Sequence, residues 1–134
     1  MAKSGSTSLT YLKQIPVKQI KLDLENPRYY EALVASGDSK WTEKKLEDHI
    51  LAEDDIADIF GSIKLKGVID PVWIYEIKSG SYVMVEGSRR LVSLRKLSTE
   101  RPPKGVSYTE ILAHVYPKTT DQKIMNVQKV ILQT

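Results

Sequence analysis

Gly87, Ser88, Arg89 and Arg90 follow one another directly after a predicted strand that ends near Glu86. Glycine lets the backbone turn sharply and come close to a ligand. The residues after it are predicted to open a helix, whose unpaired amides and positive dipole end favour an anion. The two guanidinium groups add donors that match phosphate oxygens. The segment predicts a phosphate site; the alternative is an exposed helix start whose arginines pair with acids of residues 43–58.

Glu86 is the carboxylate that the sequence places beside these arginines. It is a candidate catalytic residue, as a general base or a metal ligand next to a bound phosphate. The alternative is a carboxylate that orients Arg89 or Arg90. The chain has no cysteine and only two histidines, which excludes thiol chemistry and makes a multi-imidazole metal site hard to assemble.

The charge of the chain is unevenly distributed. The formal net charge is +3, yet residues 23–58 carry a net −7 and residues 59–134 a net +6. A basic C-terminal half indicates a surface that faces an anionic partner, although a solvated surface explains much of it.

Several elements must position these side chains. An edge strand beginning at Pro16 is predicted from Ile15, Val17, Ile20 and Leu22, and Asn26-Pro27 predicts a turn. Two helices follow, the first capped by Thr42 and the second capped by Asp54 or Asp55 and ended by Gly67. Later elements are a hairpin over 72–85 with its turn at Ser79-Gly80, a helix carrying Leu91, Leu94 and Leu97, a strand over 108–116, and a last helix capped by Thr120.

This order of elements predicts an α+β fold with a small mixed sheet and packed helices. At 134 residues the chain is the size of one domain, and we expect a flexible arm at residues 1–10 and a single domain over 11–134. No apolar run reaches the roughly 20 residues of a membrane-spanning helix, and residues 1–10 lack an apolar signal core. We therefore expect a cytoplasmic protein without a membrane partner.

Three blocks of the sequence, in order, resemble ParB-like N-terminal domains. IPVKQIKLDLENPR resembles their opening strand and Asn-Pro-Arg turn, and IADIFGSIKLKGVIDPVWI their helix that ends in glycine before a proline. YVMVEGSRRLVSLRKL resembles their Gly-Glu-Arg-Arg segment, and more closely a variant subgroup reading Glu-Gly-Asn-Arg-Arg-Leu. The blocks span residues 15–97. The resemblance implies the fold of the ParB and sulfiredoxin superfamily.

The resemblance also implies site residues, one position at a time. The phosphate-contacting motif falls on Gly87, Ser88, Arg89 and Arg90, with Ser88 where the usual motif has Glu. The earlier turn motif falls on Asn26, Pro27 and Arg28, and the loop on the base and sugar side of the nucleotide falls on Gly67, Ile69 and Pro71. A C-terminal Glu-Asn-Ile-Gln-Arg run that supplies metal and triphosphate contacts falls on residues 125–129, where Asn126 and Gln128 fit but Met125 replaces the acid.

For function, the resemblance implies a nucleotide, CTP or ATP with Mg²⁺, and DNA as partners, with a homodimer as a further expectation. Our first hypothesis is a nucleotide- or phosphate-binding module of a DNA-associated protein, forming the N-terminal part of a longer chain, with weak and salt-dependent DNA binding of its own. The alternatives are a nuclease or a nucleotide hydrolase or kinase, and a module for protein contacts. Met125 and Ser88, in place of two acids, favour binding over metal-dependent hydrolysis.

Overall fold

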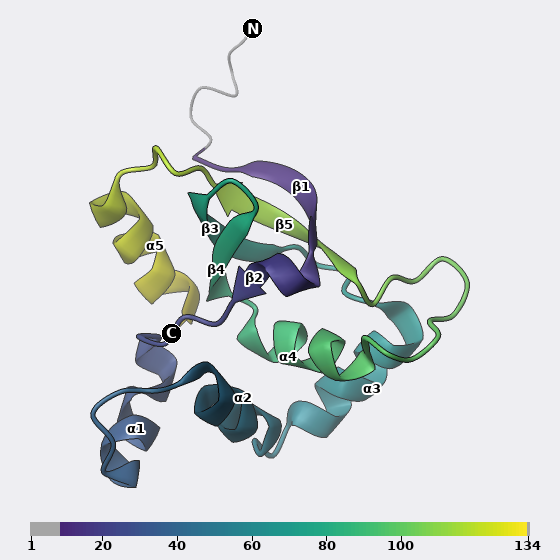
Figure 1. Ribbon diagram of the computed structural model, residues 1–134, viewed down its shortest axis with the longest axis horizontal. Helices are drawn as coiled ribbons and strands as arrows, with labels where there is room; N and C mark the ends of the chain where they lie inside the picture. Colours follow the sequence, from purple (N-terminus) through teal and green to yellow (C-terminus); the bar gives the residue numbers. More distant parts are fainter. Residues whose placement is uncertain (1–8, 134) are drawn as a thin grey trace, which may run out of the picture.

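The computed structural model describes residues 9–133, so most of the predicted arm at 1–10 lies outside the described residues. Its centre is a five-stranded mixed sheet with the order β1-β5-β3-β4-β2 (Figure 1). The strands span Tyr11–Pro16 (β1), Ile20–Lys21 (β2), Val72–Lys78 (β3), Ser81–Glu86 (β4) and Glu110–Tyr116 (β5). β3 and β4 form the predicted antiparallel hairpin, β5 runs parallel to β3, and β2 runs parallel to β4. The α+β fold class with a mixed sheet is confirmed.

Within residues 9–133, five α-helices and two short 3-10 helices surround the sheet. They are η2 (Val17–Gln19), η3 (Pro27–Tyr29), α1 (Tyr30–Ser36), α2 (Glu43–Leu51), α3 (Ile56–Lys66), α4 (Ser88–Leu97) and α5 (Gln122–Gln133). The Thr42 hydroxyl accepts a hydrogen bond from the Lys45 amide, so the predicted cap of α2 is confirmed. Gly67 ends α3 with a φ of 73°, a conformation that favours glycine. None of the helices within residues 9–133 is long and apolar enough to cross a membrane.

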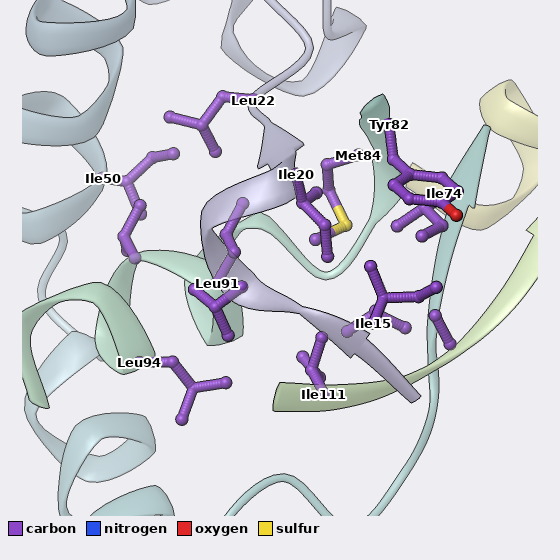
Figure 2. Close-up of a cluster of buried hydrophobic side chains, with 14 of the residues drawn as sticks. Ile15, Ile20, Leu22, Ile50, Ile74, Tyr82, Met84, Leu91, Leu94 and Ile111 are labelled. Carbon is purple, nitrogen blue, oxygen red and sulfur yellow. The ribbon is translucent and has the colours of Figure 1, made fainter. Parts of the chain in front are cut away.

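The main core lies between the sheet and helices α2 to α4. Ile74 and Met84 from the hairpin meet Leu91 and Leu94 from α4, and Ile50 of α2 closes the cluster (Figure 2). The predicted apolar stripe of α4 is therefore wholly buried, since Leu91, Leu94 and Leu97 have no exposed area. Burying a leucine side chain stabilises the fold by about 2 kcal/mol. This packing fixes the helix whose first turn carries Arg89 and Arg90.

A smaller apolar cluster lies on the other face of the sheet, beneath α5. Alternate residues of a strand point to opposite faces, and Trp73 and Tyr75 pack here whereas Val72 and Ile74 belong to the main core. Met125 of α5 is buried in this cluster against Val85 and Tyr116. The C-terminal end of α5 comes down beside η3 and α1, as Figure 1 shows.

Three local predictions were wrong, and one helix was not predicted. The first strand ends rather than begins at Pro16, because residues 17–19 form η2 before the chain pairs again as β2. The prediction at Asn26-Pro27 is confirmed, because Asn26 has extended backbone and begins the 3-10 turn η3, but helix α1 after it was not predicted. The side chain of Asp55 makes no capping bond to α3 and reaches Arg89 instead. Asp121 rather than Thr120 caps α5, since its Oδ1 accepts from the Lys123 amide at 2.8 Å.

Candidate phosphate-binding site

The chain turns at Gly87, between the end of β4 and the start of α4. Its φ of 122° is one that other residues rarely adopt, and a Cβ there would lie 2.4 Å from Val72 Cγ1. Val72 has no exposed area and cannot move aside easily. Glycine is thus required at this position for two independent reasons, backbone conformation and space. The tight turn places the first residues of α4 at the hollow described next, together with the two arginines.

A hollow of about 200 Å³ lies over this turn. It is lined by three segments that are far apart in the sequence: Asn26, Arg28 and Tyr29; Ile59; and Glu86 to Arg90, with Leu132 of α5 completing the wall. The structure therefore brings together the predicted turn motif and the predicted phosphate motif. Arg89 and Arg90 in the first turn of α4, with Arg28 of η3, form a site suited to an anion.

Arg89 reaches out of the first turn of α4 to Asp55, in the loop before α3, and forms an ion pair with it. Its side chain is about a quarter exposed, and the backbone carbonyl of Arg89 accepts a hydrogen bond from Ser93 Oγ at 2.8 Å. The alternative hypothesis, in which an arginine of this segment pairs with acids of residues 43–58, is confirmed for Arg89. The Arg89 guanidinium both forms this ion pair and lines the hollow, and the phosphate site stays a prediction.

Arg90 is fixed from two sides. Its Nη2 donates to both oxygens of Glu86, at 2.8 and 3.2 Å, and its Nη1 donates to the Asp70 carbonyl at 2.5 Å. A longer contact joins Nη1 to the Pro71 carbonyl at 3.5 Å. The Glu86 carboxylate thus orients Arg90, and Arg90 ties the loop before β3 to the start of α4.

The Asn26–Tyr29 segment builds the opposite wall. Asn26 is buried and its Oδ1 accepts from the Arg28 amide at 2.9 Å, which begins η3. The Arg28 guanidinium lies 3.8 Å from Glu53 and 5.8 Å from the centre of the Tyr29 ring. The Tyr29 hydroxyl donates to Glu53 Oε1 at 3.4 Å. Burial, with a smaller contribution from the Glu53 charge, raises the pKa of Tyr29 to about 12, so this wall carries a neutral phenol.

The loop predicted on the base and sugar side lies next to this hollow. Gly67 and Ile69 line a second hollow of about 370 Å³, which shares Ile59 and Arg90 with the first. Ile69 is 69% exposed, an unusual exposure for an isoleucine beside a hollow. Pro71 contacts the site through its backbone carbonyl, which lies 3.5 Å from Nη1 of Arg90. Together the two hollows reach the range of about 300–1,000 Å³ that is typical of small-molecule sites.

The C-terminal candidates are placed differently. Asn126 lines a separate hollow on the other side of η3, with Lys129 and Glu25, and accepts a hydrogen bond from Gln122. Gln128 lies half-buried on α5. Lys129 Nζ lies 2.5 Å from Asp23 Oδ2, a mostly buried ion pair that holds α5 against the segment before η3. The α5 residue that lines the arginine-lined hollow is Leu132 rather than Asn126.

Four residues of the site were missed by the sequence analysis. Tyr29, Ile59 and Leu132 line the hollow, and Asp55 holds Arg89. Ile59 and Leu132 carry no local signal beyond an apolar helix position, because only the packing of distant elements brings them to the site. Tyr29 follows the Asn-Pro-Arg motif directly, and that neighbourhood could have marked it.

The magnesium ion implied by the resemblance does not fit the residues present. Magnesium prefers carboxylate oxygens in octahedral geometry, and among the described lining residues of the hollow Glu86 is the one carboxylate, already bound to Arg90. Over residues 9–133, no three His, Asp or Glu side chains are grouped so that they could hold a metal ion. Met125, at the position of the family acid, is buried in the apolar cluster under α5.

Comparison with known proteins agrees with this architecture. The fold is similar to a C-terminally truncated chromosome-partitioning protein ParB from Caulobacter crescentus, complexed with CTP-gamma-S, with a TM-score of 0.56 and 17% identity over 90% of this chain and 51% of that one. The chain thus spans about half the length of that protein. Sulfiredoxin from Arabidopsis thaliana has a TM-score of 0.47 and 15% identity, over 90% of this chain and 97% of that one. No curated protein sequence matches the chain. Residues 43–115 match the ParB N-terminal domain, and because this is more than half of the sequence, the chain belongs to that family.

Proposed function

We propose that this chain is a nucleotide-binding module of the type found in partition proteins. The observation that carries the proposal is the hollow at the start of α4, where Arg28, Arg89 and Arg90 meet around a glycine turn. The ligand's phosphates bind at Gly87–Arg90, and its base and sugar lie along the Gly67–Pro71 loop. The complex of the similar ParB protein with CTP-gamma-S supports a nucleotide as the ligand, with CTP before ATP.

The finer features of the proposal follow from the same residues. We propose that the chain belongs to the variant subgroup with an acid before the glycine, because residues 86–91 resemble its motif. The chain acts in the cytoplasm as part of a longer, DNA-associated protein, and Asn126 and Gln128 contribute from α5 at the edge of the site. A homodimer is part of this proposal.

Binding, rather than catalysis, is the activity that the geometry supports. A nuclease or nucleotide hydrolase has to place a metal or a base beside the scissile phosphate. Glu86 is the candidate for that role, but its two oxygens accept hydrogen bonds from Arg90. We expect no measurable turnover of nucleotides or DNA. Multiple turnovers per minute that survive Glu86→Gln would contradict both this expectation and the choice of residue.

The experiment that tests the proposal is a calorimetric titration of the purified chain with CTP, ATP and cytidine. Replacing Arg89 and Arg90 with Ala should weaken CTP binding at least tenfold, since two charge-assisted phosphate contacts are lost. Arg101→Ala is the matched control, because Arg101 is exposed and follows the opposite end of α4. A folded double variant with unchanged affinity would overturn the site, and a wild-type chain that binds neither nucleotide would overturn the function.

DNA binding by this chain is proposed to be weak and independent of sequence. The basic side chains can neutralise phosphates, and contacts of that kind weaken steeply as salt rises. Fluorescence anisotropy with two unrelated duplexes should give similar affinities that fall together between low and physiological salt. Nanomolar binding to one duplex at physiological salt, with the other ignored, would contradict this part of the proposal.

A further inference from the structure

Three carboxylates at the arginine-lined hollow are engaged with cationic or donor side chains. Glu86 holds Arg90 through both oxygens, Asp55 holds Arg89, and Glu53 lies against Arg28 and accepts from Tyr29. A metal ion that recruited Glu86 would release Arg90, which Glu86 orients. The site would then lose an oriented phosphate donor in gaining one metal ligand.

Arg90 shows this cost most clearly. Its guanidinium contacts Glu86 through Nη2 and the backbone carbonyls of Asp70 and Pro71 through Nη1, so Glu86 helps to fix its orientation at the hollow. A guanidinium has five N–H donors, and these four contacts leave at least one for a phosphate oxygen. The Glu86 carboxylate therefore orients Arg90, and its oxygens are not free to coordinate magnesium in octahedral geometry.

Helix α5 supplies no replacement ligand. Met125 is 4% exposed, beneath α5 in the cluster with Val85 and Tyr116, and its thioether is a poor partner for a hard cation. Asn126 lies in the hollow on the other side of η3, and Lys129 adds a further positive charge beside Asp23. The oxygen donors that would complete a metal site are absent from the described part of α5 that borders the arginine-lined hollow.

We propose that this hollow binds its polyphosphate ligand as the free anion, without a divalent cation. This inference rests on the proposed function and specifies the ligand class. Arg28, Arg89 and Arg90, with the amides at the start of α4, supply the positive charge that a metal ion otherwise brings to a polyphosphate. Magnesium in solution then competes with the protein, because it binds the same phosphate oxygens and lowers the charge of the ligand.

The test is a titration of the whole chain with CTP, once in excess EDTA and once in excess magnesium, with sodium pyrophosphate as a second probe. The affinity for CTP in EDTA should equal the affinity in magnesium or exceed it by two- to tenfold. Binding that appears only with magnesium would overturn this inference and leave the proposed function intact. Absence of binding in both conditions would overturn both.

A measurement that does not depend on the nucleotide guards against indirect effects of the buffer. Substoichiometric Mn²⁺ added to the isotope-labelled chain broadens the nuclear magnetic resonances of residues near a bound ion. We expect no selective broadening at Glu86 to Arg90 in the absence of CTP. We expect the same result at a saturating concentration of CTP that exceeds the concentration of Mn²⁺. Selective broadening there in the absence of nucleotide would show a protein-held metal site and overturn the inference.

Discussion

Arg89 and Asp55 lie 34 positions apart and form an ion pair that bridges the first turn of α4 and the loop before α3. The same guanidinium lines the hollow at the start of α4. Carboxylate and phosphate oxygens both accept from a guanidinium, and Asp55 Oδ2 already accepts from Nη1 of Arg89. We therefore expect Asp55 to compete with the anion that we propose for this site.

Asp55→Asn should tighten CTP binding two- to fivefold. Exposed ion pairs contribute about 0–1 kcal/mol, and that is the free energy that the ligand no longer has to displace. Asp54→Asn is the matched control: it removes the same charge from the neighbouring exposed position. Calorimetric titration of both variants separates the local effect from the general one. A weaker affinity in Asp55→Asn would show instead that Asp55 orients Arg89 for the ligand.

How far the sequence predicts this molecule depends on how local each signal is. Thr42 and Gly67 act within one turn of their own helix, and the stripe of Leu91, Leu94 and Leu97 reports a single buried face. These predictions were confirmed because the physics behind them needs no distant partner. The Gly87–Arg90 junction was also found as a strand-to-helix turn for the same reason.

Predictions failed where the role of a residue depends on a partner that is distant in the sequence. Asp55 has the residue type and position of a helix cap, yet its carboxylate pairs with Arg89 and makes no capping bond to α3. Leu132 reads as one more apolar residue of α5, and only the docking of α5 beside η3 makes it a wall of the hollow. Met125 was interpreted as a position without a metal ligand, and its burial with Val85 and Tyr116 could not be seen in the sequence.

Gly87→Ala should both destabilise the chain and abolish nucleotide binding. The methyl group would meet Val72 at 2.4 Å in a backbone conformation that alanine avoids. We expect a loss of at least about 3 kcal/mol in the free energy of unfolding, from strain and overpacking together. Gly80→Ala is the control, since Gly80 also has a positive φ of 77° but no neighbour within 4 Å of the added atom.

Urea unfolding of the two glycine variants provides the measurement. Gly80→Ala should cost only about 1–2 kcal/mol, the price of the backbone conformation alone. Equal losses in the two variants would show that the contact with Val72 is relieved by a small shift, and that space at Gly87 is not a constraint.

Tyr29 predicts a dependence of stability on alkaline pH. Its pKa is about 12 in the folded chain and about 10 when unfolded. Above pH 10 the unfolded state releases the phenolic proton while the folded state keeps it, so stability present below pH 10 is lost as the pH rises to 12. Tyr29→Phe should remove up to about 2 kcal/mol of this loss. Urea titrations at several pH values should show the wild type falling more steeply than the variant.

Tyr30→Phe is the control for this measurement, because Tyr30 is the next residue and is 62% exposed. At neutral pH, Tyr29→Phe should cost about 1 kcal/mol through the lost hydrogen bond to Glu53. Parallel pH profiles for the wild type and Tyr29→Phe would contradict the assignment of the shift to this phenol.

The arginine-lined hollow has walls from residues 26–29, from residues 86–90 and from Leu132. During folding, the hollow is complete only when contacts that span most of the chain have formed. Such contacts form late because the loops between them are long. The transition state for folding should contain the β3–β4 hairpin and α4 but not the completed hollow. A ligand then binds only after the barrier is crossed, so saturating CTP should slow unfolding and leave the folding rate almost unchanged.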